Sequence, residues 1–384
     1  MIRTIDECFW GIQNGANIKQ SKSSGGVPIT RIETIADNKF NRDRVGYAGI
    51  TDVSSYESYI LEDEDLLMSH INSAKYLGRT VLYNRRANEV IIHGMNLLRL
   101  RANKEIINPF YAKYLFSGCK FKKQVSRITK KSVNQASFTV GDLKKIKISV
   151  PSILEQVQIV EKLDKIAGII ELRQAEIEKA EEIIKARFIE MFGDITIGNY
   201  EYETRKLGDV STIGSSHRVF TTEFVDTGIP FYRGTEIGEL ANGIKPTEPY
   251  YISEEHYSRL TSDDTKPQIG DLLMPSICNK GQVWMVDTVE PFYYKDGRVL
   301  CISPDREIFD TKYLEYFMRI KTMIEYPKLG SGSTFAEFKI FLLKNIDVLI
   351  PPRYLQEQFA DFVRQADKSK LQVYQNIVIN HRVA

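Results

Sequence analysis

The sequence predicts an α+β fold in which two tandem mixed α/β units, related by an internal repeat, are joined by two long helices that form an antiparallel coiled coil. Three observations lead to this prediction. The chain matches itself over most of its length, which indicates two copies of one unit. Each copy begins with short β-type runs separated by turn residues. Each copy ends in a segment poor in Gly and Pro, with apolar residues at helical spacing.

The internal repeat keeps one register across most of the chain. When the sequence is aligned with itself so that Arg3 lies on Arg205, Tyr111 lies on Tyr313. Further matches at the same shift are Gly26-Val27-Pro28 on Gly228-Ile229-Pro230, Glu105-Ile106 on Glu307-Ile308, Tyr114 on Tyr316, and Glu155-Gln156 on Glu357-Gln358. A register kept over this distance predicts that both copies have the same topology.

Each copy divides into a mixed α/β part and a helical part. Short β-type runs such as residues 80–83 and 282–286 lie among turn residues. Prolines at 151 and 351–352 open the helical parts, since proline suits the start of a helix. The predicted boundaries are an α/β domain at 1–150, a central helix at 151–194, a linker at 195–204, a second α/β domain at 205–350 and a C-terminal helix at 351–384.

The two helical segments carry apolar residues at alternating three- and four-residue steps, which is the heptad pattern of a coiled coil. A long amphipathic helix packed on its own domain is the alternative. A helix of about 40 residues would be about 60 Å long, more than one such domain needs, so pairing of the two helices is favoured. Gly193 stands where a helix C-cap is expected. The predicted seam consists of Leu163, Ile166, Ile170, Ile177, Ala180 and Ile184 in the first helix and Phe359, Phe362, Ala366, Val373 and Ile377 in the second.

Composition excludes several classes of protein. With 52 Lys and Arg against 50 Asp and Glu, the 384-residue chain has no overall cationic field, so any nucleic-acid binding must use local basic patches. The four cysteines and five histidines show no metal-ligand spacing, so no metal site is expected. No signal peptide or membrane span is expected either, which favours the cytoplasm.

Motifs for catalysis are missing from the sequence. It contains neither a GxxxxGK[ST] phosphate loop nor a GxGxxG dinucleotide turn. The run Asn108-Pro109-Phe110 is superficially similar to the tetrapeptide of adenine methyltransferases, but it lacks the second proline, and a structural turn is favoured. No catalytic residue is therefore predicted.

Both copies contain short motifs in the same order. In order along the chain they are Pro151-x-x-Leu154-Glu155-Gln156, residues 188–194 (FIEMFGD), residues 205–210 (RKLGDV), residues 228–233 (GIPFYR), residues 251–253 (YIS), residues 270–273 (GDLL), residues 330–334 (GSGST), and Pro351-Pro352-x-x-Leu355-x-Glu357-Gln358. These motifs resemble those of the specificity (S) subunits of type I restriction–modification systems. The resemblance covers essentially the full chain, and the order of the motifs is its most specific feature.

The resemblance implies what the chain binds. Two target recognition domains would each read one half of a bipartite site in double-stranded DNA, and the conserved helices would set their spacing. The helices would also dock methyltransferase (M) subunits, two of them, in a complex that includes restriction (R) subunits. S-adenosylmethionine, ATP and Mg²⁺ are then expected on those partner subunits, with no cofactor on this chain and no membrane partner.

DNA contact needs Lys and Arg for phosphates, and Arg, Asn, Gln, Ser or Thr for base edges. The densest basic run extends from Lys120 to Lys131 and contains no acidic residue, and residues 330–334 follow Lys328 at the corresponding place in the second copy. A solvated helix face and a plain flexible loop are the respective alternatives. The candidates for DNA contact are Arg31, Arg42, Arg44, Lys75, Lys130, Lys131, Ser132, Asn134 and Gln135 in the first copy, and Arg218, Arg233, Lys280, Gly332, Ser333 and Thr334 in the second.

Arg31 and Arg233 hold equivalent places in the two copies, each after Gly-x-Pro. Each could contact a guanine edge with two hydrogen bonds, or could brace its domain by pairing with a carboxylate such as Glu33 or Glu236. The sequence leaves both alternatives open.

Two other functions remain as alternatives to a non-catalytic DNA reader. The chain could be a coiled-coil adaptor whose α/β domains bind protein partners, or a self-contained DNA modification enzyme. Salt-dependent DNA binding distinguishes the reader from the adaptor. Binding of S-adenosylmethionine by the purified chain would favour the enzyme.

Overall fold

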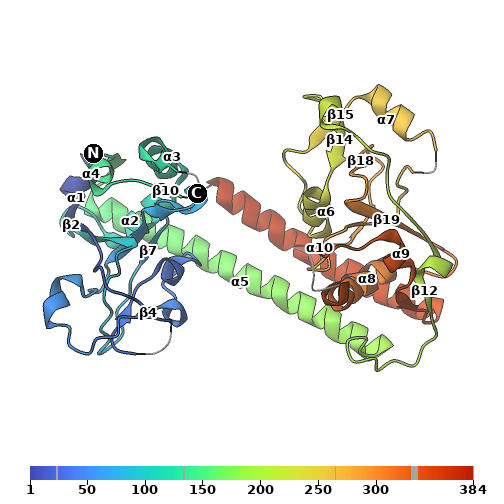
Figure 1. Ribbon diagram of the computed structural model, residues 1–384, viewed down its shortest axis with the longest axis horizontal. Coiled ribbons are helices and arrows are strands. Elements are labelled where there is room, and N and C mark those ends of the chain that lie inside the picture. The colour runs from blue at the N-terminus through green and yellow to red at the C-terminus, as the bar shows by residue number, and fades with distance from the viewer. Residues whose placement is uncertain (23–24, 133–134, 264, 330–335, 384) are drawn as a thin grey trace. The chain divides into compact units, whose positions relative to one another are not determined.

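A computed structural model describes residues 1–22, 25–132, 135–263, 265–329 and 336–383, with side chains described as far as Lys368. The chain divides into two compact units, Met1–Ile169 (unit 1) and Ile170–Ala384 (unit 2) (Figure 1). Each unit is described by itself below. Their mixed helix and strand content confirms the predicted α+β class.

Unit 1 is built around a four-stranded antiparallel sheet with the strand order β2-β8-β5-β7. A second ladder pairs the first strand, β1, with β11 just before the long helix. The elements of this unit are β1 (Ile2–Thr4), α1 (Ile5–Cys8), β2 (Phe9–Asn14), β3 (Pro28–Ile29), η1 (Ile32–Ile35), η2 (Arg42–Arg44), β4 (Gly46–Tyr47), η3 (Ser54–Tyr59), β5 (Leu66–Ser69), β6 (Ile71–Asn72), η4 (Ala74–Tyr76), β7 (Thr80–Leu82), β8 (Leu97–Ala102), α2 (Pro109–Ser117), α3 (Cys119–Ile128), β9 (Lys130–Lys131), β10 (Ala136–Ser137), α4 (Val140–Lys144) and β11 (Lys147–Ser149).

Both faces of the unit 1 sheet are buried. Successive side chains of a strand point to opposite faces, so neighbours along β5 enter different apolar clusters. Leu66 and Met68 of β5 pack with Phe116 of α2 and Phe121 of α3 in the main core. Leu67, between them, belongs to a separate apolar cluster on the other face. Burial on both faces explains why β5 is a continuous apolar run and does not alternate.

Unit 2 repeats this topology. Its four-stranded sheet has the order β13-β19-β16-β17, and β12 pairs with β20 as β1 pairs with β11. Helix α8 covers one face of the sheet and α6 the other. Its elements are β12 (Thr204–Lys206), η5 (Leu207–Asp209), β13 (Ser211–Gly214), η6 (Thr221–Glu223), β14 (Ile229–Tyr232), α6 (Gly234–Ala241), β15 (Tyr250–Ile252), α7 (Glu254–Leu260), β16 (Leu272–Pro275), β17 (Trp284–Met285), β18 (Tyr293–Tyr294), β19 (Val299–Pro304), α8 (Thr311–Glu325), η7 (Tyr326–Leu329), α9 (Ile340–Lys344), β20 (Asp347–Leu349) and α10 (Arg353–Val383).

The repeat register differs from the predicted one near the end of each copy. Tyr111 and Tyr313 are equivalent, as expected, but β11 (Lys147–Ser149) corresponds to β20 (Asp347–Leu349), which is two residues earlier than that shift requires. The prediction that Glu155-Gln156 aligns with Glu357-Gln358 is therefore wrong, and Gln156 aligns with Gln356. Unit 2 has two residues fewer between the equivalent tyrosine and strand, and the identical Glu-Gln pair concealed this deletion.

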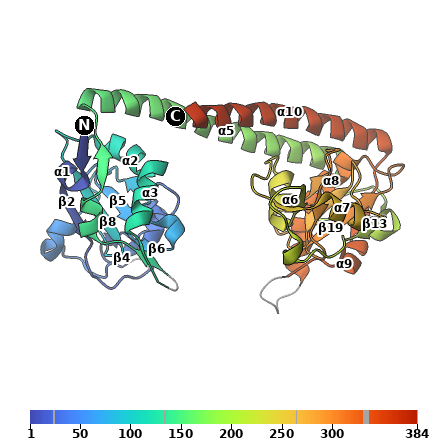
Figure 2. The ribbon, with the colours of Figure 1, turned by 90° about the horizontal axis from the view of Figure 1, so that it is seen from above.

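Helix α5 (Ile153–Phe192) and helix α10 occupy the two segments predicted to be long helices. Gly193 follows α5 with φ of 85°, the left-handed conformation expected of a C-cap glycine. Within unit 2 the rings of Phe188 and Phe192 each lie 5.5 Å from the ring of Phe359. The end of α5 thus packs on the first turns of α10, which is an antiparallel contact (Figure 2).

The predicted seam positions differ in burial. Ile177 and Ile184 are buried, while Leu163, Ile166, Ile170 and Ala180 are only partly buried. In α10, Phe359 is buried, and Phe362 and Ala366 pack against the same core. The side chains of Val373 and Ile377 lie outside the described residues. The predicted linker at 195–204 starts with a residue that belongs to the unit 2 core, Ile195.

Candidate nucleic-acid interface

The basic run of unit 1 ends in two short paired strands. Lys130 and Lys131 form β9, which pairs with β10 so that Lys131 lies opposite Ala136. Both lysines are exposed. The backbone N–H and the hydroxyl of Ser132 each donate to the carbonyl oxygen of Gln135, at 2.7 and 2.8 Å. The Ser132 hydroxyl therefore helps to close the turn, while Gln135 is exposed. Asn134, a predicted contact, lies outside the described residues.

A second basic segment lies beside these strands. Strand β10 also pairs with β6, with Asn72 opposite Ala136, so the segment that continues from β6 into η4 starts next to β10. Lys75 is exposed in η4, and its ammonium lies 5.7 Å from the centre of the Tyr76 ring. The Arg79 guanidinium lies 4.5 Å from the same ring. Tyr76 and Arg79 were not among the predicted residues, although an aromatic residue between two basic ones is a recognisable sequence signal.

Lys75, Lys130 and Lys131 have no carboxylate within ion-pair distance among the residues that the structure describes in unit 1. Exposed cations without an internal partner can bind phosphate without first breaking an ion pair. These three predicted residues thus lie on neighbouring segments and remain open to a polyanion.

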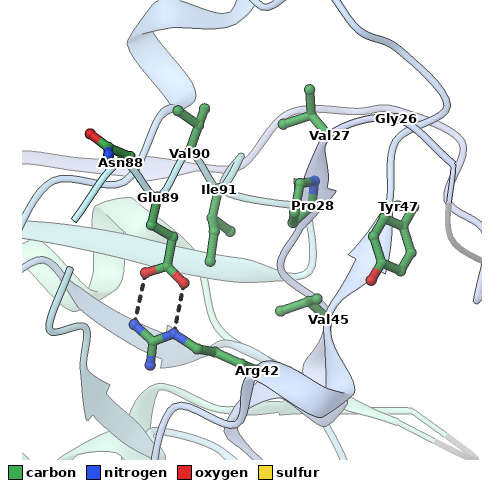
Figure 3. Close-up of a pocket in the computed structure, with 10 residues that line it drawn as sticks. All are labelled: Gly26, Val27, Pro28, Arg42, Val45, Tyr47, Asn88, Glu89, Val90 and Ile91. Atoms are coloured by element: carbon green, nitrogen blue, oxygen red, sulfur yellow. Dashed lines mark hydrogen bonds and ion pairs between the residues drawn. The ribbon is translucent and has the colours of Figure 1, made fainter. Parts of the chain in front are cut away.

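The predicted contact Arg42 has internal partners. Its Nε and Nη2 atoms each lie 2.7 Å from a carboxylate oxygen of Glu89, as the dashed lines in Figure 3 show. Nη2 also donates to the carbonyl oxygen of Asn84 at 2.7 Å, and the Tyr83 hydroxyl donates to Glu89 at 2.8 Å. The hydrogen bond from Arg42 lowers the pKa of Glu89 from 4.5 to about 2, although burial opposes the shift. The same bond raises the pKa of Arg42.

This ion pair lies in the wall of an open pocket of about 560 Å³. The residues that line the pocket are Gly26, Val27, Pro28, Arg42, Val45, Tyr47, Asn88, Glu89, Val90 and Ile91 (Figure 3). Most of these side chains are apolar, and the two charged ones, Arg42 and Glu89, pair with each other. Arg42 therefore joins η2 to the segment around Glu89, which is a structural role.

Arg31 and Arg44 also face carboxylates, but in looser pairs. The Arg31 guanidinium lies 3.4 Å from Glu33, and that of Arg44 lies 3.4 Å from Asp37. The side chains of Glu33 and Arg44 are about half exposed, and that of Asp37 is 39% exposed. Exposed pairs of this kind contribute about 0–1 kcal/mol, so either arginine can exchange its partner for a phosphate at small cost.

Arg233 in unit 2 is braced more firmly than its counterpart Arg31. Its Nη2 and Nε atoms lie 2.6 and 3.1 Å from the Glu236 carboxylate, which also accepts the backbone N–H of Arg233 at 2.8 Å. Glu236 is 5 % exposed. The guanidinium also lies 4.5 Å from the ring centre of Tyr250, which stacks on Phe224. Of the two alternatives for Arg233, this geometry favours bracing.

Arg218 and Lys280 are exposed in unit 2. The Arg218 guanidinium lies 5.2 Å from the ring centre of Phe220, and the backbone N–H of Lys280 donates to the Gln282 side chain at 3.0 Å. Within the described part of unit 2, neither cation has a carboxylate at ion-pair distance. The predicted contacts Gly332, Ser333 and Thr334 lie outside the described residues.

Three further features concern metal binding, membrane insertion and the turn at Asn108. No group of three or more His, Cys, Asp or Glu side chains among the described residues could hold a metal ion. Within the same residues, no helix has the length and apolar character needed to cross a membrane. Asn108 caps α2, its side chain accepting from the N–H groups of Phe110 and Tyr111 at 2.8 and 3.2 Å, as expected for a structural turn.

Comparison with known proteins identifies the family. The family model described as the type I restriction modification DNA specificity domain matches residues 3–182 and again residues 199–380. The chain belongs to the specificity subunits of type I restriction–modification systems, with the two tandem DNA recognition domains of that family.

Individual relatives agree with this assignment. The chain is 30% identical over 387 aligned residues to a protein named as the MjaX type I restriction enzyme specificity subunit of Methanocaldococcus jannaschii, covering 95% of this chain and 86% of that one. It is 23% identical over 156 residues to the EcoKI specificity subunit of Escherichia coli K12, covering 40% of this chain and 33% of that one.

Solved structures agree on the fold. The S subunit from M. genitalium has a TM-score of 0.52 at 14% identity, with 100% of this chain and 93% of that chain covered. A chain from a study of complex assembly and conformational transition in a type I R-M system has a TM-score of 0.53 at 17% identity, with coverage of 100% and 95%.

Proposed function

We propose that this chain is the non-catalytic reader of its restriction–modification complex and that each unit contacts one half of a bipartite site in double-stranded DNA. In this proposal methylation and cleavage take place on partner subunits. Two methyltransferase subunits and the restriction subunits would carry S-adenosylmethionine, ATP and Mg²⁺. This chain would bind none of them.

The observation that carries the proposal is a shared scaffold with different candidate contact segments. Both units have the same sheet order and the same terminal ladder. Yet unit 1 presents Lys130, Lys131 and Gln135 where the sequence of unit 2 has glycines and hydroxyl residues at 330–334. Because base readout depends on side-chain identity, two such units read two different sequences.

Exposed apolar side chains on α5 support docking of partner subunits. Leu154 is 70% exposed and Leu172 is 69% exposed. A helix that leaves large aliphatic side chains in water suits a further helix–helix contact, since burial of apolar area drives such association. The methyltransferase subunits are the partners proposed for this surface.

Methylome sequencing of the host, with and without the gene, tests the proposal. The intact strain should carry methylation at a two-part motif with an unread spacer, and the deletion strain should lose methylation at that motif alone. Replacing residues 1–150 with those of a relative should change one half of the motif and keep the other. An unchanged methylome in the deletion strain would refute the proposed role.

The absence of catalysis is tested on the purified chain. Without partner subunits, verified by mass spectrometry, it should show no methyl transfer, ATP hydrolysis or DNA cleavage. Adding methyltransferase subunits should restore site-specific methyl transfer. Turnover by the chain alone would contradict this part of the proposal.

A further inference from the structure

Helix α3 of unit 1 carries a stripe of cations along one exposed face. Lys120, Lys123 and Arg127 follow each other at three- and four-residue steps, which places them on the same side of the helix. Phe121 and Val125 point into the core from a different side. The stripe is about 10 Å long at 1.5 Å per residue.

Among the described residues of unit 1, no carboxylate lies within ion-pair distance of the stripe. Asp142 and Lys144 lie on α4, which packs near α3, but Asp142 is hydrogen bonded to Thr139 and Lys144 is paired with Asp6. None of the three stripe cations has an ion pair among the described residues of unit 1. A solvated helix face ordinarily mixes both signs of charge, so a purely cationic face indicates an anionic partner.

The corresponding region of unit 2 is neutralised. The equivalence of Tyr111 and Tyr313 places the last turns of α8, from Lys321 to Glu325, and the following η7 at the position of α3. The ammonium groups of Lys321 and Lys328 each form an ion pair with the Glu325 carboxylate at 3.1 Å. The same place in the fold therefore holds uncompensated cations in unit 1 and ion-paired cations in unit 2.

The stripe continues into the predicted contact segment. Helix α3 ends at Ile128, and only Thr129 separates it from Lys130; the Thr129 hydroxyl donates to the Val125 carbonyl at 2.7 Å. Segment 74–79 packs on the inner side of α3, since a Cβ at Gly78, whose φ is 75°, would lie 3.3 Å from Val125. Lys75, the stripe and β9 thus lie on neighbouring segments of unit 1.

We propose that the stripe Lys120–Lys123–Arg127 binds the phosphate backbone of DNA beside the bases that unit 1 reads, and that the described residues of unit 2 form no equivalent site. This inference rests on the proposed function and adds an asymmetry to it. Unit 1 supplies sequence-independent anchoring in addition to reading its half-site. Unit 2 contributes fewer phosphate contacts. Unit 1 therefore contributes more than unit 2 to the salt dependence of DNA binding.

Two matched double variants test the inference in the full chain assembled with its methyltransferase subunits. One is Lys120→Gln with Lys123→Gln, and the control is Lys321→Gln with Lys328→Gln in unit 2. Both remove two positive charges by the same substitution, so they change the overall field equally. Affinity is measured against salt concentration for a duplex with the methylated motif and for an unrelated duplex, and thermal unfolding checks that each variant is folded.

The stripe variant should make the log–log salt slope shallower by about 1.8 on both duplexes, at 0.9 for each phosphate that the protein no longer neutralises. The recognised motif should not change, and the control should keep the wild-type slope. A stripe variant with an unchanged slope, or with the same change as the control, overturns the inference. A change confined to the motif duplex also overturns it, since that would indicate base contact.

The outcome also separates the inference from the function on which it rests. If the wild-type complex binds both duplexes equally and the stripe variant still has a slope shallower by about 1.8, the phosphate site stands and sequence reading by this chain fails. If the motif is bound selectively and the slope does not change, sequence reading stands and the stripe is a solvated face.

Discussion

Gln156 and Gln356 make the same three hydrogen bonds in their respective units. The Gln156 carboxamide oxygen accepts the Asn108 N–H at 2.8 Å, and its nitrogen donates to the carbonyls of Ile106 and Pro151, both at 2.9 Å. Gln356 accepts the Asp310 N–H at 3.0 Å and donates to Ile308 at 3.0 Å and Pro351 at 2.8 Å. Both glutamines are fully buried. Each fastens the start of a long helix to the turn that opens the preceding helix of its domain.

Replacing Gln156 with leucine should destabilise unit 1 by about 1–3 kcal/mol, because it leaves buried backbone groups without partners. Gln356→Leu should have a similar effect on unit 2. Chemical denaturation followed by domain-specific fluorescence or hydrogen exchange measures both. Gln158→Leu, at an exposed position of the same helix, is the control and should stay within about 0.5 kcal/mol of wild type. Equal stability of the Gln156 and Gln158 variants would contradict the fastening role.

The Arg42–Glu89 pair should make unit 1 sensitive to acid. Because its folded-state pKa is lowered from 4.5 to about 2, Glu89 contributes stability above pH 4.5 that is lost as the pH falls toward 2. Glu89→Gln should remove about 1–3 kcal/mol at neutral pH and flatten the dependence of stability on pH in that range. Denaturant titrations at several pH values measure this. Glu57→Gln, at an exposed position, should leave the pH profile unchanged.

Arg233→Ala should lower the stability of unit 2 by about 2 kcal/mol, since it leaves the buried Glu236 carboxylate without its guanidinium partner. At temperatures where the variant is folded, its preference among DNA bases should match that of wild type. Arg218→Ala is the contrasting variant, with stability retained and a salt slope shallower by about 0.9. A folded Arg233 variant that accepts a changed base at one position of the motif would instead support guanine contact.

Changing Lys130 and Lys131 together to alanine should weaken binding to all DNA sequences about equally, with a salt slope shallower by about two if both lysines touch phosphate. Lys145→Ala with Lys147→Ala is a control of equal charge at exposed positions around β11. Fluorescence anisotropy over a range of salt concentrations measures both variants. If the two double variants give the same slope, Lys130 and Lys131 belong to an ordinary solvated surface.

The sequence alone predicted the repeat and the helices, because these are periodic signals. Apolar spacing and a Gly-poor segment predicted α5, and Gly193 was expected at its C-cap. The repeat predicted one topology for both copies, and the sheet orders confirm it. The alignment failed at Gln358 because matching identical letters cannot detect a two-residue deletion, whereas the ladder between β12 and β20 fixes the register.

The candidate contacts were less predictable, because sequence gives the type of a side chain but not its neighbours. Arg42 and Lys75 looked alike as basic residues in polar surroundings. The fold brings Glu89, 47 residues along the chain, against Arg42 and leaves Lys75 in solvent. Lys120 and Lys321 likewise look alike in the sequence, but the fold leaves Lys120 exposed, whereas Lys321 is partly buried and pairs with Glu325.

The sequence by itself therefore determined the architecture of two repeated α/β units with their helices and, through ordered motifs, the family. These depend on local spacing and on residue order along the chain. The tertiary structure decided which cations are held by carboxylates and which remain open to DNA. That decision depends on contacts between residues far apart in sequence, and ion pairing is a short-range interaction that spacing along the chain does not encode.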